Sequence, residues 1–187
     1  MACALTKGRV EPCKDSIGGL KEVYFSTNFG DLNAATSSLG TNDDVENFDA
    51  STATVFKYDL RGTSSFEGTI NSSRDTGTSF FIQTLNLSLK KLSAADNKEI
   101  KLLAYERPQI IVRDYNDNYF LVGREHGAEL TGGTMVTGAA MGDMSGYTLT
   151  FEAQELTPAN FVGVDSNDGS TMTVGTTTIT ITSGSDF

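Results

Sequence analysis

The chain has 187 residues and a formal net charge of −10, from 24 acidic against 14 basic residues. This length suffices for one hydrophobic core in one domain, which would bury about 70 % of the surface of the unfolded chain. The acidic balance argues against tight nucleic-acid binding, because phosphate would be repelled. Frequent glycine, three prolines and no tryptophan, with serine and threonine throughout, favour a mainly β protein.

The first part of the chain predicts an arm, a strand and a long loop. Residues 1–21 form a polar N-terminal arm, which lacks the apolar stretch of a secretory signal, so we expect the protein to be made in a cytoplasm. Glu22–Ser26 is the first β-prone run. Residues 27–50 are rich in Asn, Asp, Ser and Gly and are predicted to be a loop. Cys3 and Cys13 are interpreted as reduced, structural residues.

The middle of the chain predicts a long hairpin. Thr54–Tyr58 and Phe66–Asn71 read as strands, and the polar segment Asn71–Gly77 reads as a turn. Beyond it, residues 83–89 alternate strictly between apolar or amide side chains and small polar ones. This period of two predicts a long strand with one buried face.

One helix is predicted, over about residues 93–106. Ser93 and Asp96 form a start that resembles a capping box, and apolar residues then recur at helical spacing. Pro108 is expected to close the helix.

Two further features indicate strands in the second half. Ile110–Tyr115 and Tyr119–Val122 flank Asn116–Asn118, whose residue types tolerate the positive φ angles of a tight hairpin turn. In Tyr147–Glu152 alternate residues are apolar and are expected to face a core.

The C-terminal extension, residues 157–187, contains an uncharged, threonine-rich segment. Met172–Thr182 is predicted to be one flat strand that would be an aggregation hazard if left exposed. The elements together predict a mainly β fold, a β-sandwich or partial barrel with one packed helix and a long hairpin.

Catalytic chemistry is poorly supported, and we expect neither an enzyme nor a cofactor. His126 is the single histidine, and no nucleophile-elbow motif accompanies it, so an exposed imidazole at a strand end is the simpler interpretation. Gly132–Gly138 has the spacing of a phosphate loop but lacks its Lys-Ser/Thr, which favours a flexible or bulged loop.

Carboxylates offer an alternative of a different class. Asp114–Glu125 matches most of a calcium-loop template, but Tyr119 replaces the required glycine. With the acidic cluster Asp165–Asp168, this pattern leaves open a calcium-dependent carbohydrate-binding or adhesion module. Acidic pairs such as Glu152 with Glu155 are expected to be solvated surface.

The order of features from Val112 to Glu155 resembles the tail tube (major tail) proteins of bacteriophages. A strand, an Asn/Asp turn, a strand ending in glycine and a glycine-rich stretch lead to the Asp143–Gly146 turn and a Tyr-Thr-Leu-Thr-Phe strand. The opening Met-Ala-Cys and Asp-Ser-Ile-Gly-Gly-Leu-Lys-x-Val-Tyr-Phe are similar to virion proteins of phages from Bacteroidetes-like hosts. The resemblance covers about residues 1–26 and 53–156.

The resemblance implies a virion protein that closes into hexameric rings, which stack into a conduit for DNA ejection. Its partners would be copies of itself and other tail proteins; DNA would pass without specific binding, and no segment would span a membrane. Capsid decoration or head-to-tail joining remains the alternative within virions. Strand pairing between neighbours would involve the hairpin and the C-terminal strand. The candidate assembly residues are Ser72, Arg74, Asp75, Thr176, Ile179 and Ile181.

Overall fold

The computed structural model describes residues 7–10, 13–32, 34, 37–50 and 52–184. In chain order the elements are β1 (Leu20–Ser26), β2 (Ser38–Leu39), β3 (Val45–Asn47), β4 (Thr52–Asp59), β5 (Ser65–Ser73), β6 (Thr78–Lys90), α1 (Ala94–Leu103), β7 (Ile110–Asp114), β8 (Tyr119–Val122), β9 (Glu129–Val136), β10 (Gly146–Glu155), β11 (Asn160–Phe161), β12 (Ser166–Asn167), β13 (Thr171–Val174) and β14 (Thr177–Ser183).

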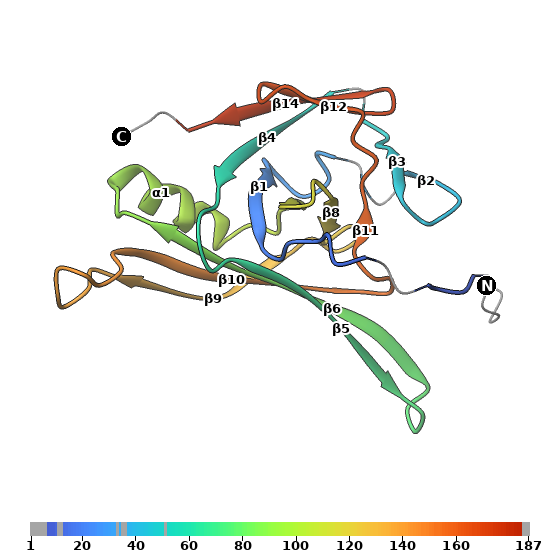
Figure 1. Ribbon diagram of the computed structural model, residues 1–187, viewed down its shortest axis with the longest axis horizontal. Coiled ribbons are helices and arrows are strands. Elements are labelled where there is room, and N and C mark those ends of the chain that lie inside the picture. Colours follow the sequence, from blue (N-terminus) through green and yellow to red (C-terminus); the bar gives the residue numbers. More distant parts are fainter. Residues whose placement is uncertain (1–6, 11–12, 33, 35–36, 51, 185–187) are drawn as a thin grey trace.

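Two sheets form the body of the molecule (Figure 1). An eight-stranded sheet, in the order β11-β8-β7-β1-β4-β14-β13-β12, curls into a half-barrel. A four-stranded sheet, in the order β5-β6-β10-β9, packs against its outer face, and β2 and β3 form a small separate pair. The predicted mainly β fold, a sandwich or partial barrel with one helix, is confirmed.

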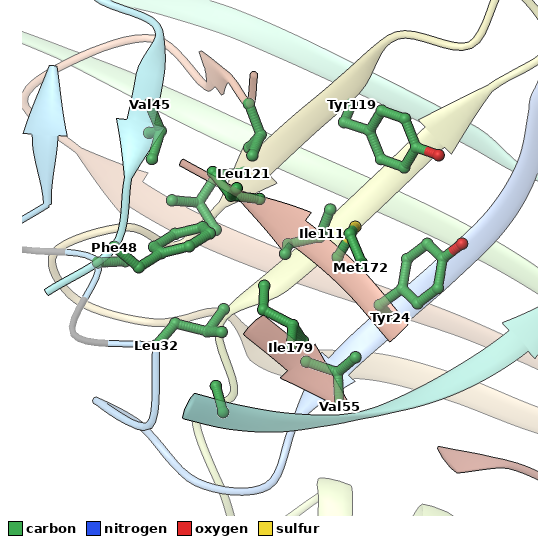
Figure 2. Packing of buried hydrophobic residues seen from close by; sticks show 14 of the residues in the cluster. Tyr24, Leu32, Val45, Phe48, Val55, Ile111, Tyr119, Leu121, Met172 and Ile179 are labelled. Carbon is green, nitrogen blue, oxygen red and sulfur yellow. The ribbon is translucent and has the colours of Figure 1, made fainter. Parts of the chain in front are cut away.

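The eight-stranded sheet has a hydrophobic core on each face. The sandwich core lies between the two sheets and includes Phe25, Leu85 and Phe151. The half-barrel core fills the inside of the curl, where Figure 2 shows Tyr24 and Ile111 among its residues. Central strands therefore carry apolar side chains on both faces, which explains the consecutive apolar or aromatic residues 23–25 in β1 and 110–112 in β7.

The alternation predicted for residues 83–89 and 147–152 produces the middle pair of the four-stranded sheet. In the antiparallel register of β6 and β10, the core-facing partners are Leu85 with Phe151, Leu87 with Leu149, and Leu89 with Tyr147. The β7–β8 hairpin also forms as predicted, and Asp117 in its turn has a φ of 61°.

The helix begins where the sequence indicates and ends earlier. The Ser93 side chain accepts a hydrogen bond from the backbone N–H of Asp96, which caps α1, and the helix stops at Leu103, well before Pro108. Ile100 and Leu103 pack against the sandwich core. Among the described residues, no helix is long and apolar enough to cross a membrane.

The prediction that residues 27–50 form a loop is wrong in two respects. The segment contains the short strands β2 and β3, and it supplies Leu32, Val45 and Phe48 to the half-barrel core, each 0 or 1 % exposed. Its scattered apolar residues lack periodicity because they reach the core from irregular backbone, so a periodicity argument does not detect them.

The single C-terminal strand predicted over Met172–Thr182 is in fact a hairpin. β13 turns at Gly175, with a φ of 58°, into β14, which lies between β13 and β4 and runs parallel to β4. The uncharged strand is thus covered on both sides within one chain, and the expected aggregation-prone edge does not exist.

Phe48→Ala tests whether the segment 27–50 is part of the core. Phe48 is 1 % exposed, so its truncation is expected to lower the free energy of unfolding by about 3 to 5 kcal/mol. Leu39→Ala, at a residue of the same segment that is 38 % exposed, is the control and is expected to change it by about 0.5 kcal/mol or less. Urea unfolding of both variants measures this, and equal effects would contradict the assignment.

Candidate functional site

The four-stranded sheet ends in two long, exposed edge strands, β5 and β9. Each pairs on one side only within the described part of the chain. Nearly all residues of both strands are exposed. The glycine-rich stretch expected to be a loop is mostly β9, and the bulge considered for it occurs where Thr131 has no partner opposite Thr150 and Phe151. Unpaired edges of this length are templates for pairing with another chain.

The β5–β6 hairpin extends away from the body, and its tip carries three of the candidate assembly residues (Figure 1). Ser72 lies near the end of β5, and Arg74 and Asp75 lie in the turn; all three are exposed. The turn is tighter than the predicted Asn71–Gly77, because pairing continues to Ser73 with Thr78. These positions are accessible, and their role in assembly stays a prediction.

The C-terminal candidates differ in placement from what was expected. Ile179 is 0 % and Ile181 7 % exposed, and both belong to the half-barrel core of this chain. The premise that they lie on an exposed edge strand is therefore wrong. Thr176 is exposed in the β13–β14 turn, where its N–H and hydroxyl both donate to Asn47 Oδ1, at 3.1 Å each.

An ionic network crosses the centre of the eight-stranded sheet around Glu22, which is 8 % exposed. Its Oε2 accepts hydrogen bonds from the Tyr24 hydroxyl at 2.6 Å and from Arg113 Nη1 at 2.8 Å, and Lys57 Nζ lies 3.0 Å from Oε1. Arg113 also pairs with Asp117 at 2.6 Å. The strands β1, β4 and β7 are thus joined by charges as well as by backbone hydrogen bonds.

The network holds Glu22 in its charged form. Burial by itself would raise the pKa of this carboxyl, but hydrogen bonds from Tyr24, Arg113 and Lys57 outweigh it and lower the pKa from 4.5 to about 2. Burial and the neighbouring carboxylate raise the pKa of Tyr24, which also accepts a hydrogen bond from Asn167. Every charge in the network has a partner of opposite sign, so the network stabilises the pairing of β1 with β4 and β7.

A second polar cluster surrounds the tight turn from Gly123 to Gly127, between β8 and β9. Glu155, at the end of β10, is 2 % exposed, and its Oε1 accepts hydrogen bonds from the N–H groups of Glu125 and His126. Its Oε2 lies 3.0 Å from His126 Nδ1. The expectation that Glu155 is a solvated surface acid is wrong. His126 is exposed as expected, with 60 % of its side chain accessible, but the sequence did not indicate its contact with Glu155.

The calcium template does not come together in the folded chain. Asp114 accepts hydrogen bonds from the N–H groups of Asn116 and Asn118 within its own turn, while Glu125 lies beside Glu155. Asp168 likewise caps the N–H groups of Ser170 and Thr171. In the described residues, the group of potential metal ligands brought together is Glu125, His126 and Glu155. Cys13 is an exposed free thiol and not a core residue, and Cys3 lies outside the described residues.

Comparisons with protein-family models, with curated proteins and with solved structures return no match. The functional argument therefore rests on the geometry of this chain.

The Glu22 network makes stability depend on pH in a defined direction. A carboxyl whose pKa is lowered on folding stabilises the protein above its unfolded pKa, near 4.5, and this contribution is lost as the pH falls towards about 2. The contribution of Glu22 to the free energy of unfolding at neutral pH is on the order of 3 kcal/mol. Glu22→Gln is expected to lower the free energy of unfolding most at neutral pH and progressively less as the pH falls through this range.

Urea unfolding from neutral pH downwards measures this difference, with Glu67→Gln, at an exposed glutamate, as the control. A deficit of Glu22→Gln that stays constant down to pH 2 would contradict the assigned network.

Gly123 and Gly77 form a matched pair for testing the tight turn. Both have positive φ, 69° and 67°, so alanine at either position carries a similar backbone strain of about 1 to 2 kcal/mol. A Cβ on Gly123 would also lie 2.5 Å from the carbonyl carbon of Gly127, whereas Gly77 has open space. Gly123→Ala is expected to cost about 2 kcal/mol more than Gly77→Ala in thermal or urea unfolding; equal costs would refute the packed turn.

Proposed function

We propose that the chain is a structural subunit that assembles into closed rings, which stack into a tube like those of phage tails. The observation that carries this proposal is the four-stranded sheet with two long exposed edges, β5 and β9. Backbone pairing between the two edges of neighbouring copies removes both edges at once. The sixfold count and the virion location come from the sequence resemblance.

Strand direction favours a ring. All three pairings in the sheet are antiparallel, so β5 and β9 run in opposite directions. Rotation about a ring axis keeps the direction of each strand along that axis. β9 of one copy therefore meets β5 of the next in antiparallel orientation, and the sheet continues without a change of pattern around a closed ring.

Both edges carry exposed apolar side chains on the core side of the sheet. Ile70 on β5 and Met135 on β9 lie on the same side of the sheet as the sandwich core, and they are 65 % and 62 % exposed. Beside β9, a groove of about 330 Å³ is lined by residues of α1, β9 and β10, including Ile100 and Gly133. Pairing of β5 with β9 places the apolar side chains of both strands on the same side of the junction and buries apolar surface.

The other face of the sheet suits the wall of a DNA conduit. Glu67, Glu152 and Glu129 fall in one row across the sheet, with Thr84 between the first two. The four strands contain a single basic residue, Lys90. Repeated around a ring, the row makes a belt of carboxylates among threonine and asparagine side chains, along which DNA slides because phosphate is repelled.

The projecting β5–β6 hairpin supports stacking of one ring on the next. Its tip extends beyond the sandwich core and carries charges of both signs, Arg74 and Asp75. In a stack, such a hairpin reaches the adjacent ring while its base stays in its own.

Negative-stain electron microscopy of the purified protein at rising concentration, with cross-linking, tests the proposal. Hollow rings or tubes are the expected result. A chain that stays monomeric at high concentration, also in the presence of a tail initiator, overturns it. Particles that form only on a preformed capsid favour decoration or joining instead.

Lysine substitutions test which surface assembles. Ile70→Lys and Met135→Lys place a charge in the proposed junction and are expected to abolish rings or raise the assembly concentration at least tenfold. Ile17→Lys is the control, because Ile17 has the same exposure of 65 % but precedes β1. All three variants are expected to keep their stability within about 0.5 kcal/mol. Rings that survive both junction variants would exclude this junction.

A further inference from the structure

Three metal-ligating side chains converge where the β8–β9 turn meets the end of β10. One ligand atom from each of Glu125, His126 and Glu155 lies within 4.8 Å of the other two. Glu155 is buried, Glu125 is half-buried, and His126 exposes 60 % of its side chain. The cluster thus has a closed inner side and an open outer side from which an ion can enter.

The cluster carries excess negative charge. Two carboxylates approach one imidazole, and in the described part of the chain the ion pairs of Glu125 and Glu155 are limited to that of Glu155 with His126. A protonated imidazole supplies at most one positive charge. Low dielectric strengthens the repulsion between a buried carboxylate and a second carboxylate, and a cation bound between them would relieve it.

We propose that Glu125, His126 and Glu155 bind a divalent transition-metal ion of the zinc class. Imidazole nitrogen and carboxylate oxygen are both zinc ligands, with bonds of about 2.0 to 2.2 Å. Two tetrahedral ligands at that bond length are separated by roughly 3.3 Å, and His126 Nδ1 lies 3.0 Å from Glu155 Oε2. The ion lies between these two atoms, any proton on His126 Nδ1 is released to solvent, Glu125 supplies the third ligand, and water completes the shell.

The ligand set selects among cations. Calcium and magnesium are bound through oxygen ligands, in larger number than this turn offers. A nitrogen ligand with two carboxylates favours zinc, cobalt and nickel over them.

The backbone is already fixed in the binding geometry. Gly127 has a φ of 77°, and a Cβ there would lie 2.5 Å from the Arg107 carbonyl oxygen. Gln83, which is 1 % exposed, accepts a hydrogen bond from the N–H of Gly123. Glu155 Oε1 accepts hydrogen bonds from the backbone N–H groups of the other two ligand residues, Glu125 and His126. Little ordering is required when the ion arrives, which favours affinity.

Isothermal titration of the untagged full chain with Zn²⁺ tests the site, with both cysteines alkylated so that thiolates do not bind the ion. One saturable site per chain is expected, with a Co²⁺ absorption spectrum typical of nitrogen and oxygen ligands and with no matching response to Ca²⁺ or Mg²⁺. His126→Gln and Glu125→Gln are each expected to weaken zinc binding at least tenfold. Glu106→Gln, at an exposed glutamate outside the turn, should bind as the parent does.

Circular dichroism confirms that each variant is folded. Absence of saturable zinc binding by the parent chain overturns the proposal. Equal affinity of the parent, His126→Gln and Glu125→Gln also overturns it, since the ion then binds elsewhere. The result is independent of whether rings form, because the ligands lie outside the two free edges.

Discussion

The eight-stranded sheet has to bury both of its faces, and β1 is the strand through which this is achieved. Val23 and Phe25 point into the sandwich core, while Tyr24 points into the half-barrel core on the opposite face. β1 pairs with β7 on one side and with β4 on the other. The segment before β4, the C-terminal hairpin and the four-stranded sheet all contribute to the two cores that cover this strand.

Burying both faces leaves polar groups inside, and several of them pair with segments distant in sequence. Glu22 is matched by Lys57 and Arg113 from neighbouring strands. Gln83 accepts from Gly123, and Gln109 Nε2 donates to the Arg124 carbonyl at 2.9 Å. The contact between Gln83 and Gly123 ties the four-stranded sheet to the turn after β8, and losing it would cost about 1 to 3 kcal/mol, because a buried polar group would be left without a partner.

The same arrangement leaves the outer half of the four-stranded sheet free. Its two middle strands are anchored by the sandwich core, whereas β5 and β9 extend past the material that covers them. The proposed assembly uses these extended edges. The proposed metal site lies at the C-terminal end of β10, where Glu155 contacts the β8–β9 turn. The proposed junction and the proposed metal site therefore belong to the same four-stranded sheet.

The sequence by itself determined the elements whose signals are local. The period of two in β6 and β10, the Ser93 cap and the Asn/Asp turn of β7 and β8 depend on neighbouring residues, and all were predicted. Only the tertiary structure decided the strand order and the contacts between residues distant in sequence. It placed Ile179 in a core, made Glu155 a buried partner of His126, and left β9 as an edge, because burial and charge pairing depend on strand order, which no local pattern encodes.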